Sequence, residues 1–337
     1  MRTTETNALL EVEGLAKKFP VQRAFWQEKK VVHAVNGIGF ALKPGRSLGI
    51  VGESGSGKST TARLVLRLIE PDEGKVMFQG RDLLKMNRKE LRALRKDMQM
   101  VFQDPYGSLN PHMTVEQLLR FNLKVFGLDG QGRQKAREAM EMVGLPERLA
   151  DRYPRDLSGG QRQRVNIARA LITSPSLVVA DEPVAALDKS VQAQVLNLFL
   201  DLQKQLKLSC LFISHDLNVV RFICDEVIVM YLGRIVEWAS SEDIWRHPRH
   251  PYTIALFQSI PQVGSSRELA QPIRGELPSP LHPPAGCAFH TRCPFADETC
   301  ARERPELKEA AAGHRVACWM AEDDLASRRQ AAAMLRP

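Results

Sequence analysis

A glycine-rich octapeptide that directly follows a short apolar stretch constrains this chain more than any other feature. Residues 52–59 read Gly-Glu-Ser-Gly-Ser-Gly-Lys-Ser, and the stretch Ser47–Val51 precedes them. A strand, a glycine-rich turn and a helix in this order form a phosphate cradle, because glycine lets backbone N–H groups close around the anion. Lys58 then reaches the β- and γ-phosphates, the Ser59 hydroxyl can ligate Mg²⁺, and the helix dipole adds attraction. We therefore predict nucleotide binding by Gly52, Glu53, Ser54, Gly55, Ser56, Gly57, Lys58, Ser59 and Thr60.

The composition is that of a globular chain with a moderately basic surface. The 337 residues are 44% apolar and 26% charged, with a formal net charge of +8. No apolar run approaches the roughly 18 residues that cross a bilayer, and residues 1–8 are polar, so we expect a cytoplasmic protein. The positive charge fits contact with an anionic membrane surface or with nucleic acid, and equally a solvated surface without such a partner.

Strand and helix patterns alternate along the chain and predict a layered α/β core. Residues 9–18 and 31–42 alternate apolar and polar positions like antiparallel strands, with a charged loop at 21–30 between them. Apolar segments separated by helical spacing predict further strands, the fully apolar ones buried on both faces. These strands are expected at 47–51, 75–78, 98–102, 176–180, 209–213 and 226–230, and helices at 60–69, 164–172 and 192–207. Helical spacing over 115–143, broken near 127–132, predicts an all-helical lobe at 104–157.

Two adjacent carboxylates follow one of the apolar strands. Residues 178–180 lead directly into Asp181 and Glu182, at the edge of the sheet where parallel strands end. Asp181 suits contact with Mg²⁺, and Glu182 suits polarising a water molecule for attack on a γ-phosphate. The same pair could instead cap a helix. With the phosphate loop upstream, we favour metal contact by Asp181 and catalysis by Glu182.

A second glycine-containing turn is predicted to open a helix at residues 157–164, which read Leu-Ser-Gly-Gly-Gln-Arg-Gln-Arg. Such a turn presents another set of N–H donors to phosphate, although one nucleotide needs only one cradle. The segment resembles the LSGGQ signature of ABC transporter ATP-binding subunits. In that family two ATPase domains face each other, and the signature of one closes on the ATP held by the other. The resemblance implies contacts to the partner's ATP by Ser158, Gly159, Gly160 and Gln161.

The same resemblance implies a fold and assigns two more catalytic residues. The fold is a P-loop NTPase core of the RecA-like type with an antiparallel β edge layer, an inserted all-helical subdomain and a small cysteine-containing C-terminal extension. Gln103 matches the Q-loop glutamine, which contacts the metal ion and the attacking water. His215 matches the switch histidine, which touches the γ-phosphate. The domain boundaries that follow are 1–245 for the nucleotide-binding domain and 246–337 for the extension.

Two further matches to the family are less complete. Phe19 is the best candidate for the aromatic side chain that stacks on adenine, although Phe19 could equally belong to the core, and His33 or Val35 lies near the same edge. Asp188 matches the D-loop aspartate. Around Asp188, alanine stands at position 185 in place of the family's serine and lysine at 189 in place of a small or apolar residue. We expect this departure to modulate hydrolysis without abolishing it.

Three other segments narrow the resemblance to one branch of the family. Residues 102–111, 247–253 and 275–280 resemble the dipeptide and oligopeptide importer ATPases, closest to their F-type subunit. The resemblance implies two integral membrane permeases, a paralogous ATPase as dimer partner, an extracytoplasmic solute-binding protein, and a peripheral position on the cytoplasmic face of the inner membrane. It implies import of di- or oligopeptides or related solutes, and no nucleic acid. The rival class is a cytosolic ABC ATPase that acts on nucleic acid, but no obvious binding insertion or second ATPase domain is present.

Four cysteines crowd the last fifth of the chain. In a cytosolic protein such a group suggests a metal before a disulfide. Members of the importer branch often bind a [4Fe-4S] cluster in this region, so the resemblance implies a cluster on these thiols. The spacing C-x5-C-x6-C-x17-C is not a standard one, and zinc, with His290 or His314 as substitute ligands, or unligated thiols are the alternatives. The predicted cluster ligands are Cys287, Cys293, Cys300 and Cys318.

Overall fold

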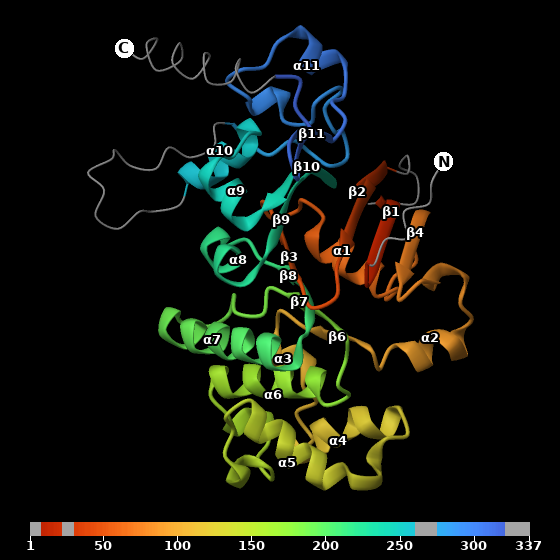
Figure 1. Cartoon of the computed structure of the whole chain (residues 1–337), viewed down its shortest axis with the longest axis vertical. Coiled ribbons are helices and arrows are strands. Elements are labelled where there is room, and N and C mark those ends of the chain that lie inside the picture. Colours follow the sequence, from red (N-terminus) through yellow and green to blue (C-terminus); the bar gives the residue numbers. More distant parts are fainter. Residues whose placement is uncertain (1–7, 22–29, 260–274, 321–337) are drawn as a thin grey trace.

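The computed structural model describes residues 8–21, 30–259 and 275–320. Figure 1 shows a helical part with α4 and α5 at one end of the molecule and the β-sheets in the middle. At the other end lies the C-terminal part, by which we mean the described residues 246–259 and 275–320. The charged loop predicted at 21–30 lies, apart from its two end residues, outside the described residues. Within the described ranges, no helix is both long enough and apolar enough to cross a membrane.

The central sheet positions most of the predicted site. Its middle strands are parallel and fully buried, which explains why their sequences are unbroken apolar runs. Because parallel strands end at one edge, the residues that follow them share that edge. In spatial order the strands are β11 (Lys308–Ala311), β12 (His314–Val316), β10 (Arg234–Ser240), β9 (Glu226–Tyr231), β3 (Ser47–Val51), β8 (Ser209–Ile213), β7 (Leu177–Asp181) and β6 (Met98–Val101).

A second, antiparallel sheet forms the predicted edge layer. Its order is β2 (Lys30–Leu42), β1 (Leu10–Val21), β4 (Glu73–Phe78) and β5 (Arg81–Asp82). Buried side chains of β1, β2 and β4 form one apolar cluster with residues of β3 and β8 and of the helix that follows the phosphate loop. The edge sheet therefore packs against α1 (Lys58–Val65), the helix beside it in Figure 1.

The helices of eleven or more residues match the sequence patterns, as does α1 after the phosphate loop, whereas the other short helices do not. α1 begins at Lys58, two residues before the predicted start, and α6, capped by Ser158, begins at Gly159, five residues before the predicted start. The unpredicted helices have four to eight residues, too few for a clear periodicity. The helices are α1 (Lys58–Val65), α2 (Arg88–Leu94), α3 (Pro105–Ser108), α4 (Val115–Val125), α5 (Gly132–Met142), α6 (Gly159–Leu171), α7 (Lys189–Leu206), α8 (Leu217–Ile223), α9 (Ser241–Arg246), α10 (Pro251–Gln258) and α11 (Glu298–Arg302).

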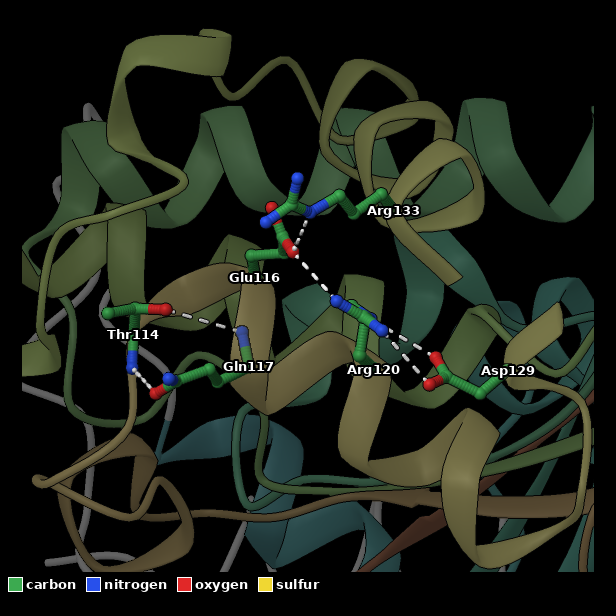
Figure 2. A network of polar contacts seen from close by, with 6 residues as sticks. All are labelled: Thr114, Glu116, Gln117, Arg120, Asp129 and Arg133. Atoms are coloured by element: carbon green, nitrogen blue, oxygen red, sulfur yellow. Dashed lines mark hydrogen bonds and ion pairs between the residues drawn. The ribbon is translucent and has the colours of Figure 1, made fainter. Parts of the chain in front are cut away.

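A polar network fixes the helical part around α4. The Thr114 hydroxyl accepts a hydrogen bond from the Gln117 N–H at 3.3 Å, and the Gln117 side chain accepts one from the Thr114 N–H at 2.9 Å. Arg120 bridges Glu116 at 3.1 Å and Asp129 at 3.0 Å, as Figure 2 shows. Asp129 lies between α4 and α5, so these bonds stabilise the break in helical spacing that was predicted near 127–132.

The C-terminal residues extend the central sheet. Strand β12 pairs with β10, where Val316 lies opposite Glu237. The fully buried Glu237 carboxylate accepts hydrogen bonds from His314 Nε2 at 2.7 Å and from the backbone N–H groups of Arg249 and His250. The C-terminal part is therefore joined to the core by backbone pairing and by buried hydrogen bonds to Glu237. The boundary at 245/246 stays a prediction.

Replacing Gly49 of β3 by alanine should destabilise the fold. A Cβ at Gly49 would lie 2.3 Å from the Val220 Cγ1 atom and 3.1 Å from the Cys224 Sγ atom, so α8 would have to move away from the sheet. Overpacking of this kind costs about 1–3 kcal/mol, which for a chain of this length corresponds to a Tm lowered by roughly 1–4 °C. Thermal unfolding followed by circular dichroism checks this. Gly130→Ala is the control, because a Cβ at Gly130 would meet no atom within 4 Å.

Candidate nucleotide site

The phosphate loop connects β3 to α1 and is wedged between two other strands. Gly57 has a φ of 101°, and a Cβ there would lie 2.3 Å from the Ala34 carbonyl oxygen of β2. Gly52 has a φ of 151°, and a Cβ there would lie 2.2 Å from the Met230 carbonyl oxygen of β9. Because the loop backbone approaches both strands so closely, only glycine fits these two positions. The predicted residues 52–60 thus form one continuous turn into the N-terminus of α1.

Lys58 is buried inside this turn. Its side chain is only 5% exposed, and Nζ donates hydrogen bonds to the carbonyl oxygens of Gly52 at 2.7 Å and Glu53 at 2.9 Å. Burial lowers the pKa of Lys58, and the nearby charges of Glu182 and Asp181 oppose that shift. The ammonium group is therefore partly desolvated and held where it can exchange carbonyl oxygens for phosphate oxygens.

Ser59 and Asp181 form an oxygen-donor pair at the same edge. The Ser59 hydroxyl donates a hydrogen bond to Asp181 Oδ1 at 2.9 Å, although the two residues come from α1 and the end of β7. Burial raises the pKa of Asp181, and the hydrogen bond from Ser59 opposes that shift. A hydroxyl and a carboxylate are hard oxygen ligands, which Mg²⁺ prefers together with water and phosphate oxygens. The pair fits the predicted magnesium site.

Glu182 lies between the two other predicted catalytic residues. Its Oε2 atom accepts a hydrogen bond from Gln103 Nε2 at 3.0 Å and lies 3.3 Å from His215 Nδ1. The backbone of Glu182 has a φ of 46°, a left-handed conformation that costs free energy for a residue other than glycine. The Glu182 N–H donates to the Ile213 carbonyl oxygen, which ties this strained residue to β8. Gln103, Glu182 and His215 follow β6, β7 and β8, so three strand ends bring them together.

The signature segment caps α6 and stands apart from the phosphate loop. The Ser158 hydroxyl accepts a hydrogen bond from the Gln161 N–H, and the Gln161 side chain accepts one from the Ser158 N–H. A Cβ at Gly160 would lie 2.5 Å from the Val191 Cγ1 atom of α7, so the turn is packed against the start of α7. Among the residues that the structure describes, no hydrogen bond or ion pair joins 158–161 to 52–60. This separation is compatible with a site completed by a second subunit.

The signature helix also contacts the segment around Gln103, and these contacts were not predicted from the sequence. Arg162 is buried and lies over the Tyr106 ring at 3.8 Å. The Asn166 side chain donates to the Phe102 carbonyl oxygen at 3.2 Å, and Arg169 donates to the Ser108 carbonyl oxygen. A movement of the segment 102–108, which contains Gln103, would therefore shift α6 as well. The spacing of three or four residues along 162–169 was the available signal.

The two remaining predicted nucleotide contacts, Phe19 and Asp188, are exposed. Phe19 is 36% exposed near the end of β1, where it pairs with Val32 of β2, the strand whose Ala34 touches Gly57. Asp188 precedes the first residue of α7, and the structure gives it no side-chain capping bond. Stacking of Phe19 on adenine and a role of Asp188 across a dimer both stay predictions.

The predicted iron–sulfur cluster is wrong. Within the described part of the chain, no group of three or more His, Cys, Asp or Glu side chains is arranged to hold a metal ion, which also removes the zinc alternative. Two of the four cysteines contribute to apolar packing instead. Cys300 is buried, and Cys287 and Cys293 pack against the main core. Burial raises the pKa of Cys293 to about 12 and that of Cys318 to about 11, so these thiols remain protonated at neutral pH.

Two residues of the C-terminal part touch the phosphate loop through contacts that were not predicted from the sequence. The Tyr252 hydroxyl accepts a hydrogen bond from the Glu53 N–H at 2.8 Å. Arg292 forms two hydrogen bonds with the Glu53 carboxylate. These partners are 199 and 239 positions apart in the sequence, so no local pattern could have paired them.

Comparisons with known proteins agree with this geometry. Residues 35–185 match the ABC transporter family, and residues 236–300 match the C-terminal region of oligopeptide/dipeptide transporters. A putative peptide import ATP-binding protein of Brucella ovis is 49% identical over 94% of this chain and 98% of its own length. The oligopeptide transport ATP-binding proteins AppF of Bacillus subtilis and OppF of Salmonella typhimurium are 47% and 46% identical, over 95% and 93% of this chain and 99% and 96% of their own.

Solved structures of ATP-binding cassettes share the fold. The dimeric MJ0796 cassette bound to ADP and Pi has a TM-score of 0.62 and 29% identity, covering 69% of this chain and 98% of its own. CbiO1 of Clostridium perfringens, part of the ABC transporter complex cbiONQ, has the same TM-score and identity, covering 72% and 92%. These likenesses confirm the predicted fold class, the resemblance to the family and ATPase activity. The chain belongs to the ATP-binding, ATP-hydrolysing subunits of ABC transporters, in the branch with an oligopeptide/dipeptide-type C-terminal region.

Proposed function

We propose that this subunit couples ATP hydrolysis to the uptake of di- or oligopeptides, or of related solutes, by a membrane importer. The observation that carries the proposal is the position of Glu182 between Gln103 and His215, close to the buried Lys58, in a chain with an oligopeptide/dipeptide-type C-terminal region. The relatives' names, peptide import and oligopeptide transport ATP-binding proteins, support peptides as the solute class.

In the proposed reaction, the loop N–H groups and Lys58 bind the ATP phosphates, and Phe19 stacks on adenine. Ser59 and Asp181 would hold Mg²⁺, which neutralises phosphate charge when bound. The Glu182 carboxylate takes a proton from the attacking water. The water oxygen bonds to the γ-phosphorus, and the bond between the γ-phosphorus and the ADP oxygen breaks.

The other two catalytic residues act on the same γ-phosphate. Gln103 would orient the attacking water and help to hold the metal ion, and His215 would contact the γ-phosphate. The short distances from Gln103 and His215 to the Glu182 carboxylate support this division of roles. The products are ADP and inorganic phosphate.

The proposed assembly has two ATPases beneath two permeases. Residues 158–161 and Asp188 would complete the ATP site of a paralogous ATPase, and the partner's signature would complete this one. Two integral membrane permeases, fed by an extracytoplasmic solute-binding protein, would hold the ATPases at the cytoplasmic face of the membrane. ATP would draw the ATPases together and hydrolysis would release them, which switches the permeases between access states.

Affinity purification of the tagged Glu182→Gln chain from gently solubilised cells, with Mg²⁺ and ATP, tests this proposal. Mass spectrometry should identify two permeases and a second ATPase, because blocked hydrolysis retains the ATP-bound assembly. Recovery of nucleic acid or ribosomes without membrane subunits would overturn the importer. The matched control is Lys58→Ala purified in parallel, from which we expect less of the second ATPase.

A further inference from the structure

One residue of the phosphate loop is held by the C-terminal part of the chain. The Glu53 N–H donates to the Tyr252 hydroxyl at 2.8 Å. The Glu53 carboxylate accepts from Arg292 Nη1 at 2.8 Å and from Arg292 Nη2 at 3.1 Å. The Glu53 carbonyl oxygen accepts from Lys58 Nζ at 2.9 Å. The same residue thus contacts the phosphate-binding lysine and both C-terminal side chains.

The contact to Arg292 has the geometry of a strong ion pair. Both terminal nitrogens of the guanidinium face the two carboxylate oxygens, an arrangement that lysine cannot reproduce. The Arg292 side chain is 5% exposed and that of Glu53 is 25% exposed, so water screens the pair only weakly. Arg292 Nη1 also donates to the Tyr231 hydroxyl at 3.3 Å, which fixes the orientation of the guanidinium.

The two C-terminal side chains are themselves rigidly supported. The rings of Tyr231, Tyr252 and Phe289 pack together with centroid separations of 4.6 to 5.4 Å. His250, also buried, caps α10 by accepting a hydrogen bond from the Tyr252 N–H at 3.0 Å. The Tyr252 hydroxyl and the Arg292 guanidinium are therefore presented to the loop by a preorganised aromatic cluster.

Gly52 and Gly57 pack closely against β9 and β2, and the contacts to Glu53 add a further constraint on a loop whose glycines would otherwise allow many backbone conformations. If the loop binds ATP in only one conformation, the apparent affinity for ATP is the intrinsic affinity multiplied by the fraction of chains in that conformation. Contacts that fix Glu53 therefore raise the fraction of chains in which Lys58 and the loop N–H groups are ready for phosphate.

We propose that Tyr252 and Arg292 are positioning residues, through which the C-terminal part holds the phosphate loop in its ATP-binding conformation. The inference rests on the proposed role of residues 52–60 in binding ATP. The C-terminal part would then act on the ATP affinity of this subunit, and any partner that displaced Arg292 from Glu53 would weaken ATP binding.

The test measures the Kd for MgATP and the Tm on the purified full chain. Tyr252→Phe, which removes only a hydroxyl, and Arg292→Lys, which keeps the charge, should each weaken ATP binding by roughly three- to tenfold. Arg292→Gln should weaken it by roughly tenfold or more. In a Glu53→Gln background, Arg292→Gln should change the Kd by less than about twofold, because the partner is already lost.

Two controls make the outcome decisive. Arg302→Gln removes an exposed arginine paired with Glu298 in the same part of the chain and should leave the Kd unchanged. Wild-type Kd values for both Tyr252→Phe and Arg292→Lys, or a lowered Tm with a wild-type Kd, would overturn the inference. If Lys58→Ala also bound ATP normally, the assignment of the loop itself would fail. If Lys58→Ala lost ATP while the Tyr252 and Arg292 variants did not, only the positioning role would fail.

Discussion

Glu182→Gln should bind MgATP with nearly wild-type affinity and hydrolyse it at least about 100-fold more slowly, the usual range for loss of a general base. The glutamine amide fills the same space between Gln103 and His215 but cannot take a proton from water. The rate is best followed as phosphate release in the assembled importer, with the partner ATPase's own phosphate-loop lysine replaced so that a single site turns over.

Glu242→Gln provides the matched control for this loss of a carboxylate. Glu242 is exposed on α9 and pairs only with Arg246 among the ion pairs of the described residues, so turnover should not change. Hydrolysis by Glu182→Gln within a few-fold of the wild-type rate would remove Glu182 from the catalytic role.

Lys58→Ala should lose ATP binding by at least about tenfold, because a hydrogen bond from a charged group contributes roughly 1.5–3 kcal/mol and Lys58 is expected to make more than one to phosphate. Without the ammonium, the carboxylates of Asp181 and Glu182 would also face the phosphates with less compensating charge. Equilibrium binding of a fluorescent ATP analogue, competed with ATP, measures the effect.

Lys85→Ala is the control for the lysine substitution. The Lys85 ammonium is exposed and lies 3.7 Å from the Asp82 carboxylate. This contact is longer and more exposed than the hydrogen bonds of the buried Lys58. Equal Kd values for Lys58→Ala and Lys85→Ala would contradict the assignment of the phosphate loop.

The parts of the fold and site that follow from contiguous sequence were predictable. The phosphate loop, the strand that ends at Asp181 and the Ser158 cap are each encoded within about ten residues, where local backbone preferences decide the structure. Parallel strands that end at one edge then bring Gln103, Glu182 and His215 together without further information.

The parts that depend on distant contacts were not predictable. The pairing of β12 with β10, and the contacts of Tyr252 and Arg292 with Glu53, join segments far apart in the chain and leave no periodic trace. For the cysteines, by contrast, a metal site was predicted that is absent from the described residues. Their number and the family resemblance suggested ligands, but a thiol that is buried among apolar side chains satisfies the same sequence pattern.

The most direct measurement is a structure of the assembled importer carrying Glu182→Gln with MgATP bound. We expect ATP phosphates on the N–H groups of residues 52–60 and on Lys58, with Ser59 at the metal ion and the partner's signature closing the site. We also expect Arg292 to contact Glu53 in that state. ATP bound away from Lys58, or a γ-phosphate remote from Gln103, His215 and position 182, would contradict the account.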